Sequence, residues 1–312
     1  MCLIVTCHIL QYYNNDLCYW FNVGVQIFFI ISGYLYGGKA IGNPIRFIVK
    51  QFKKILIPYY VVLFIIVMSY IIVCPEQLQI TSVVKAVFCA GTIPGVGHLW
   101  FVGYILLYYA LIPYLYWLKE SLTGRCLGFK IATYAGILII LQILGNLFHS
   151  YFLPDRLACF FIGYFMIDIK QSCKGCTKQI FMILTICVGI FLNIIRAIIP
   201  TLNLPVSTTI INGYTRYAHL LLGVSLFLLI VVLFKNAGYN RLLSWSDKYS
   251  YQYYLIHGLL ILSPLTLLNV TSISLLNCVI AVTAIAALSV LLRKASDSVS
   301  HFVDGRMTFE CK

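Results

Sequence analysis

The sequence has few charged residues, and this excludes an ordinary soluble protein. Charged side chains make up 10% of the 312 residues, whereas a soluble domain has about 25%. Hydrophobic residues make up 61%, and the mean hydropathy is +0.93. Apolar runs of about 18 residues or more, each long enough to cross a bilayer, recur along the chain. The composition therefore predicts a polytopic membrane protein.

Strict alternation of polar and apolar residues is missing from these runs, which excludes a membrane β-barrel. Continuous apolar blocks instead predict an all-α bundle of about ten transmembrane helices. We expect the whole chain, 1–312, to form one transmembrane domain, with 293–312 as a short cytoplasmic tail. The expected helices are 1–13, 20–38, 55–74, 98–118, 131–148, 155–169, 179–199, 217–234, 249–267 and 273–292.

Acidic residues are scarce, so the chain is strongly basic. Nine Asp and Glu stand against 22 Lys and Arg, a net charge of +13. When the connection after the second segment is placed in the cytoplasm, the inner stretches hold 18 of the 22 basic residues. This asymmetry predicts cytoplasmic N and C termini. Orientation and attraction to anionic membrane lipids account for the charge, so it does not indicate a nucleic-acid partner.

The first apolar segment is too short for a spanning helix. Residues 1–13 supply thirteen residues, where about 20 are needed. The segment lacks the basic region and the cleavage site of a signal peptide. We expect it to be the outer half of a helix whose start lies upstream. A re-entrant half-helix is the alternative.

The cysteine pattern does not predict a metal site. Most of the 12 cysteines lie in apolar segments, where a thiol behaves as a small hydrophobe. Cys173 and Cys176 have the spacing of a redox motif, but without a βαβ context we interpret the spacing as incidental. A disulfide between Cys74 and Cys89, at the two ends of an expected outer loop, stays open.

Two histidines lie within apolar segments, where a polar group is costly and often functional. His8, in "LIVTCHILQYYNND", lies roughly 8 Å below the outer surface. His257, in "YYLIHGLLI", lies roughly 12 Å from the inner side. In a core about 30 Å thick they would differ in depth by about 10 Å, so one polar cavity could hold both. Imidazole can take a proton from an alcohol; a structural hydrogen bond is the alternative for each.

Three more candidates lie where segments begin on the expected outer side. His98 and Trp100 occur in "GVGHLWF", where a tryptophan is ordinarily an interfacial anchor. Arg156 follows Asp155 at the start of the sixth segment. Arg156 is either a paired or snorkelling charge or a group that binds an anionic part of a substrate.

The inner stretch "RFIVKQFKKILIPYY" (46–60) is basic. Its lysines Lys50, Lys53 and Lys54 follow one another at helical spacing. Such a cluster suits a phosphate-bearing ligand at the cytosolic face. Positive-inside anchoring is the alternative.

Several blocks together resemble the family-3 membrane acyltransferases, bacterial enzymes that O-acetylate cell-surface and secreted polysaccharides. The blocks follow the order of the family, and the resemblance covers nearly the whole chain. They are "IVTCH", "NVGVQIFFIISGYLYG" (22–37), "ILIPYY", "HLWFVGYILLYYALIPYL" (98–115), "FFIGYF" (160–165) and "YLIHGLLI" (254–261).

The resemblance implies a multi-pass O-acyltransferase of the bacterial plasma membrane. His8 matches the family's helix 1 histidine and would be the catalytic base, with His257 as a second polar group in the passage. Cytosolic acetyl-CoA would be the co-substrate, no bound cofactor is expected, and the acceptor would be a hydroxyl of a surface or lipid-linked polysaccharide. The acyl-CoA-binding candidates are Lys50, Lys53 and Lys54, and the acceptor-side candidates are His98, Trp100 and Arg156.

The sequence departs from the family pattern at the expected donor site. The family favours two arginines, three residues apart, before its third helix, and Gln51 and Lys54 align there. Lysine lacks the bidentate fork of arginine, and Gln51 lacks the charge. The family's basic residue about ten positions before the histidine would precede Met1. These departures keep a non-catalytic relative open; a transporter or flippase of lipid-linked sugars is the other alternative.

Ser32, in "IISGY", is a conceivable covalent acyl carrier. A serine-glycine pair in a membrane helix is more often a packing contact. The sequence leaves open whether the acyl group is carried on the protein.

Overall fold

The computed structural model describes residues 1–147, 154–172, 176–199, 208–234 and 238–310. Within these ranges the chain is helical and has no strand, so the predicted all-α class is confirmed. A helix occurs at each of the ten predicted segments. The structure adds α2 (Cys18–Phe21), α5 (Ile80–Val87) and the short 3-10 turns η1 (Pro75–Gln77) and η2 (Gly97–Leu99).

Six stretches of the described chain are long and apolar enough to cross a membrane. This confirms the predicted polytopic helical membrane protein. The stretches are Cys18–Gly37, Pro44–Val73, Gly97–Ser121, Leu127–Leu144, Gly213–Leu233 and Ser274–Val303.

The helices belong to two compact units that alternate along the chain. The first unit comprises Met1–Asn22, Gly42–Ala110 and Tyr239–Lys312, and the second comprises Val23–Ile41 and Leu111–Gly238. The helix α6 (Trp100–Ser121) contributes its first half to the first unit and its second half to the second.

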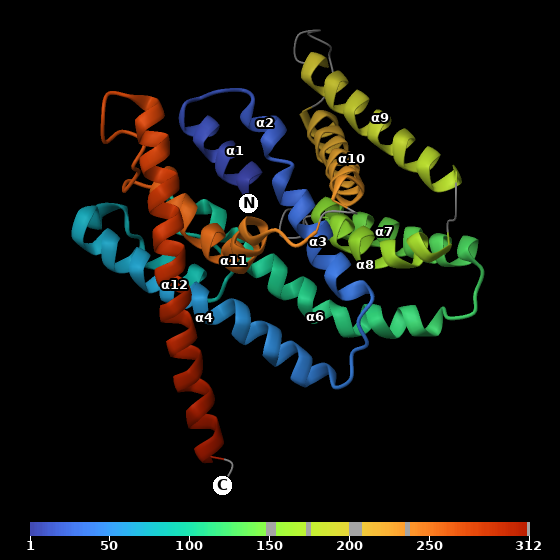
Figure 1. Cartoon of the computed structure of the whole chain (residues 1–312), viewed down its shortest axis with the longest axis horizontal. Coiled ribbons are helices and arrows are strands. Elements are labelled where there is room, and N and C mark those ends of the chain that lie inside the picture. Colours follow the sequence, from blue (N-terminus) through green and yellow to red (C-terminus); the bar gives the residue numbers. More distant parts are fainter. Residues whose placement is uncertain (148–153, 173–175, 200–207, 235–237, 311–312) are drawn as a thin grey trace. The chain divides into compact units, whose positions relative to one another are not determined.

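In the first unit, α11 (Arg241–Ile261) packs against α1 (Cys2–Tyr12), α4 (Pro44–Val73) and α12 (Ser274–Glu310) (Figure 1). The helix α4 begins well before the predicted apolar segment. Asn43 caps it by accepting a hydrogen bond of 2.9 Å from the Arg46 N–H, and Pro44 occupies the first turn, where its missing N–H costs nothing. The basic stretch is therefore the first part of α4.

The segment 75–97, which lies between the predicted helices 55–74 and 98–118, contains a helix, α5, that returns along α4. The hydroxyls of Tyr59 and Tyr60 on α4 donate to the carbonyls of Ala86 and Val87 at the end of α5, at 2.6 and 3.0 Å. Tyr60 precedes the end of α4 by 13 residues, which corresponds to roughly 20 Å along the helix axis. The segment therefore re-enters the depth of α4.

This return path separates Cys74 from Cys89. Both thiols are free. Cys74 follows the end of α4, whereas Cys89 lies three residues beyond Ala86, which is bonded to Tyr59. A disulfide needs Cα atoms within about 7 Å, so the open possibility of this disulfide is removed. The Cys173–Cys176 spacing lies partly outside the described residues, because 173–175 are not described.

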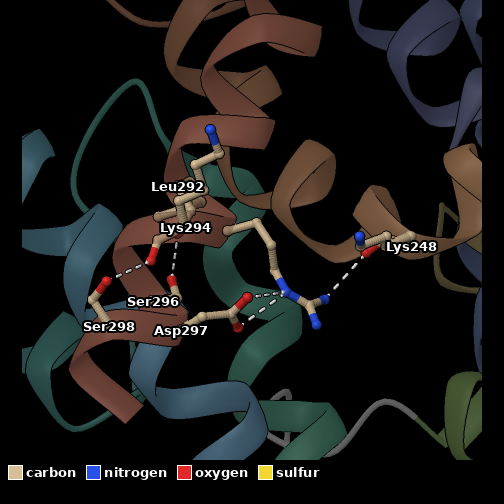
Figure 2. A network of polar contacts seen from close by, with 7 residues as sticks. Lys248, Leu292, Lys294, Ser296, Asp297 and Ser298 are labelled. Carbon is tan, nitrogen blue, oxygen red and sulfur yellow. Dashed lines mark hydrogen bonds and ion pairs between the residues drawn. The ribbon is translucent and has the colours of Figure 1, made fainter. Parts of the chain in front are cut away.

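The helix α12 continues past its predicted end at residue 292 to Glu310. Just beyond the apolar segment, the Arg293 guanidinium donates to both oxygens of Asp297 at 3.1 and 3.0 Å and to the Lys248 carbonyl of α11 at 3.2 Å (Figure 2). The hydroxyls of Ser296 and Ser298 bond carbonyls four residues earlier in α12. Arg293 thus joins α12 to α11 where the apolar segment gives way to polar residues.

In the second unit, α3 (Gly24–Gly37) and α8 (Pro154–Ser172) approach so closely that only glycine fits at the contact. A Cβ atom added to Gly33 or Gly37 would lie 2.0 Å from a carbonyl oxygen of α8, and one added to Gly163 would lie 2.1 Å from the Ile30 carbonyl of α3. Small residues of this kind allow membrane helices to pack by their backbones. Ser32 is buried in this helix, as expected for a packing residue.

A polar cluster joins four helices of the second unit. Lys119 of α6 donates to the Gly37 carbonyl at 2.6 Å and pairs with Asp168 of α8 at 2.8 Å. Tyr134 of α7 (Leu127–Leu147) donates to the other Asp168 oxygen at 3.3 Å. The ammonium satisfies a C-terminal carbonyl of α3, a group that has no partner within the helix. The remaining helices, α9 (Cys176–Ile198) and α10 (Thr208–Leu233), pack against each other.

Candidate active site

Three histidines, distant in the sequence, form one cluster in the first unit. The rings of His8 and His257 are stacked, with centroids 5.2 Å apart and an interplanar angle of 29°. The ring of His98 meets His257 edge-on, with centroids 4.7 Å apart. The structure therefore brings together the two histidines predicted to share a cavity and the histidine predicted on the acceptor side.

The depth difference of about 10 Å expected between His8 and His257 is larger than their observed separation. That expectation counted backbone rise along two helices taken as perpendicular to the membrane. The side chains of α1 and α11 extend toward each other and bring the ring centroids within 5.2 Å.

Backbone carbonyls of α11 fix the protonation of the two buried rings. His257 Nδ1 lies 2.6 Å from the Tyr254 carbonyl, and His98 Nε2 lies 3.2 Å from the Leu255 carbonyl. A carbonyl can only accept, so these nitrogens carry the proton. The Tyr254 hydroxyl in turn donates to the His98 carbonyl. α11 thus holds both rings in defined tautomers.

The other nitrogen of each buried ring carries a lone pair, and no hydrogen-bond donor among the described residues reaches it. These atoms are His257 Nε2 and His98 Nδ1. The His257 side chain is fully buried and the His98 residue is 6% exposed. Buried polar atoms are usually satisfied, so each of these two nitrogens is an unused hydrogen-bond acceptor.

Glycine at position 258 allows His98 to lie against α11. A Cβ atom at Gly258 would lie 1.9 Å from His98 Nδ1 and 2.2 Å from its Cε1. Contacts under 3.0 Å essentially never occur for a real Cβ. The Gly258 backbone therefore covers the unused nitrogen of His98. The other unused acceptor, His257 Nε2, is not covered by this glycine.

His8 is the most accessible imidazole of the cluster. It is half-buried, whereas His98 and His257 are buried. Its Nδ1 lies 3.0 Å from Oε1 of Gln11, one turn later in α1. Across the side chains that the structure describes, no group of three or more His, Cys, Asp or Glu is arranged to hold a metal ion. An accessible imidazole such as that of His8 is suited to proton transfer and hydrogen bonding.

The basic residues of α4 are connected to the same helix as His257. The Tyr251 hydroxyl of α11 donates to the carbonyl of Ile55, the residue after Lys54, at 3.0 Å. From Tyr251 to His257 is six residues of α11, or roughly 9 Å along its axis. Between them Gln252 is 4% exposed, and its Oε1 has no partner in the described part of the chain.

Two of the three predicted donor-site lysines lie on one exposed stripe. Lys50 and Lys54 are exposed, four residues apart, and Arg46 precedes them by the same interval on the same exposed face. Lys53 is half-buried on another side of the helix. Gln51, the position without charge, is buried, so the sequence departure falls on a residue that points into the protein.

The remaining acceptor-side candidates are Trp100 and Arg156. Trp100 follows η2 at the start of α6, where its ring contacts Phe101 and Tyr104. Arg156, in the first turn of α8, belongs to the second unit, where it is half-buried beside the buried Asp155.

The sequence reasoning missed four residues of the site: Gln11, Gln252, Tyr254 and Gly258. Gln11 was detectable, because a polar side chain three residues after a histidine faces it on a helix. Gly258 and Tyr254 act on His98, which is more than 150 residues away in the sequence. No local pattern indicates such a contact.

The described chain is a helical membrane protein that carries three clustered imidazoles and an exposed basic stripe in its first unit. The sequence model of the acyltransferase domain family matches residues 1–294. The chain therefore belongs to this family of membrane acyltransferases, which includes polysaccharide O-acetyltransferases. Searches of curated proteins and of solved structures gave no match.

Proposed function

We propose that this chain is an O-acyltransferase that moves an acetyl group from acetyl-CoA to a hydroxyl of a cell-surface or lipid-linked polysaccharide. The observation that carries the proposal is the imidazole cluster, in which one ring, His8, is accessible while the other two are held by backbone carbonyls. Family membership supports the acyl transfer. The chemistry of imidazole and of the basic side chains supports their assignment as base and as CoA-binding groups.

In this mechanism His8 acts as the general base. Its unbonded nitrogen takes the proton of the acceptor hydroxyl while the hydroxyl oxygen attacks the thioester carbonyl carbon. The new carbon–oxygen bond forms, the carbon–sulfur bond breaks, and the electron pair leaves with the sulfur of CoA. The proton then passes from His8 to the departing thiolate. The products are an ester and free CoA, and His8 returns to its neutral form.

The donor would approach from the side of the basic residues. The exposed cations Lys50 and Lys54, with Arg46, suit the phosphates of CoA, and Lys53 adds a half-buried charge. The buried Gln252 offers an acceptor to an amide N–H of the pantetheine arm, between this stripe and His257. The positive-inside orientation makes this the cytosolic side.

The acceptor would reach the cluster from the opposite side of a bacterial plasma membrane. His257 Nε2 would accept a hydrogen bond from a substrate O–H or N–H. His98 would position His257 through their ring contact. Trp100 and Arg156 remain candidates for binding the glycan, Trp100 by stacking on a sugar face and Arg156 by pairing with an anionic group.

The test is the release of free CoA thiol by protein purified in nanodiscs and supplied with acetyl-CoA and a surface-glycan extract. We compare wild type with His8→Ala, and with His301→Ala as a matched control, because His301 is exposed on α12. Removal of a general base typically costs a factor of about 10² to 10⁴. We therefore expect at least a 100-fold loss in His8→Ala and no change in His301→Ala.

Equal CoA release by wild type and His8→Ala would refute His8 as the base. No release by wild type, with acetyl-CoA or with longer acyl-CoA donors, would favour the non-catalytic or transporter alternative. In cells, gene deletion should remove acetyl groups from a surface glycan while glycan export continues. Loss of export together with the glycan would instead indicate a transporter.

A further inference from the structure

We infer that Gln11 is a positioning residue that sets the tautomer of His8 and so makes its Nε2 the basic nitrogen. The inference rests on the proposed function and adds a residue to it. Its basis is the 3.0 Å contact between His8 Nδ1 and Gln11 Oε1. An amide oxygen can only accept a hydrogen bond, so Nδ1 donates and carries the proton. The lone pair is then on Nε2.

Helix geometry makes this contact a built feature of α1. The two residues are three positions apart, and side chains at this interval lie on the same face of a helix. Gln11 lies in the last turn of α1, where its own carbonyl accepts from the Asn14 N–H. The backbone around Gln11 is therefore held while its side chain reaches back to His8.

The other two rings of the cluster show why His8 needs a side-chain partner. His257 and His98 are held by the main-chain carbonyls of Tyr254 and Leu255. Their tautomers are fixed by the fold. His8 is bonded to the Gln11 side chain and not to a main-chain carbonyl. Its tautomer therefore depends on a side-chain amide that a substitution can remove.

In the described part of the chain, the ring stacked on His8 is that of His257. α1 packs against α2 and α11. From α11 the ring facing His8 is His257, with His98 behind it. From α2 the contact is Cys18, whose carbonyl accepts from the Cys7 thiol. Gln11 thus holds Nδ1 of the ring, in the role that a carboxylate has beside the histidine of other acyl-transfer sites.

The first test reads the tautomer directly and does not need turnover. Protein labelled with ¹⁵N-histidine is reconstituted in nanodiscs, and the His8 ring signals are identified by their loss in His8→Ala. At a pH where the ring is neutral, wild type should show a protonated Nδ1 and a bare Nε2. Gln11→Glu, an acceptor of nearly the same shape, should keep this tautomer. Gln11→Met, which has a similar length but no comparable acceptor, should lose it.

The second test is kinetic. Gln11→Met should lower kcat for acetyl transfer about tenfold or more and leave KM for acetyl-CoA unchanged, because the base is misoriented while the donor site is intact. Gln11→Glu should retain turnover. Its carboxylate stabilises the imidazolium form, so the acid limb of the pH–rate profile should move to higher pH by about one unit or more.

Two results would overturn the inference. One is a wild-type tautomer and wild-type kcat in Gln11→Met. The other is an equal loss of activity in Gln11→Met and Gln11→Glu with an unshifted pH profile, which would make Gln11 a structural residue of α1. Both differ from failure of the proposed function, in which His8→Ala releases CoA as fast as wild type while the ¹⁵N signals still report the tautomer.

Discussion

Replacement of Gly258 by alanine should disable the histidine cluster without removing any of its functional groups. In the structure the added Cβ would lie 1.9 Å from His98 Nδ1. Ordinary contact begins at 3.4 Å, so the His98 ring would have to retreat by about 1.5 Å. A retreat of this size breaks the 3.2 Å bond to the Leu255 carbonyl and disturbs the contact with His257.

The size of the effect follows from these losses. Overpacking of a well-packed site costs about 1–3 kcal/mol, and one hydrogen bond contributes about 1 kcal/mol. We therefore expect Gly258→Ala to lower the free energy of unfolding by about 2–4 kcal/mol. A misplacement of about 1 Å can cost 100-fold in rate. We accordingly expect kcat for acetyl transfer to fall by at least about tenfold.

The assay pairs thermal unfolding in detergent with CoA release, and the chain offers a matched control. Gly97 lies next to His98, yet a Cβ atom there would meet no atom within 4 Å. Gly97→Ala should therefore behave as wild type. In the double variant Gly258→Ala/His98→Ala the methyl group fills space left by the ring, so most of the stability should return. A Gly258→Ala protein with wild-type Tm and kcat would refute the reasoning.

Two further predictions concern the second unit and the donor side. Lys119→Met should lower the free energy of unfolding by about 2–3 kcal/mol, because it leaves the buried Asp168 carboxylate without its cation. In thermal unfolding, the double variant Lys119→Met/Asp168→Leu should regain most of this stability. An equal loss of stability in the single and the double variant would contradict the prediction. Replacing Arg46, Lys50 and Lys54 together by glutamine should raise KM for acetyl-CoA about tenfold and weaken its salt dependence, with kcat unchanged; a wild-type KM would exclude the exposed stripe as the phosphate site.

Local sequence properties were sufficient to predict the class of the protein and the approximate positions of its helices. A helix in lipid must satisfy its backbone within the segment, so long runs with few charges are informative by themselves. The ten predicted segments were all found as helices, with boundaries shifted mainly where polar residues continue a helix. The extensions of α4 to Pro44 and of α12 to Glu310 are of this kind, because hydropathy marks the membrane and not the end of helical hydrogen bonding.

The choice of His8 and His257 as candidates also came from the sequence, since an imidazole in an apolar segment is costly and conspicuous. The stacking of these two rings and the contact of His98 with His257 could not be predicted from the sequence. His98 is bonded to α11 across 157 positions of the chain, and the return of α5 along α4 depends on the side chains of Tyr59 and Tyr60.

The sequence alone thus determined that this protein consists of apolar helical segments, and which of these segments carry a polar side chain that is costly to place in lipid. The tertiary structure decided which polar groups meet, which nitrogen of each buried ring is protonated, and which lysines face outward. The physical reason is that hydropathy acts on each segment separately, whereas hydrogen bonds and close contacts such as that of Gly258 with His98 depend on how distant segments pack.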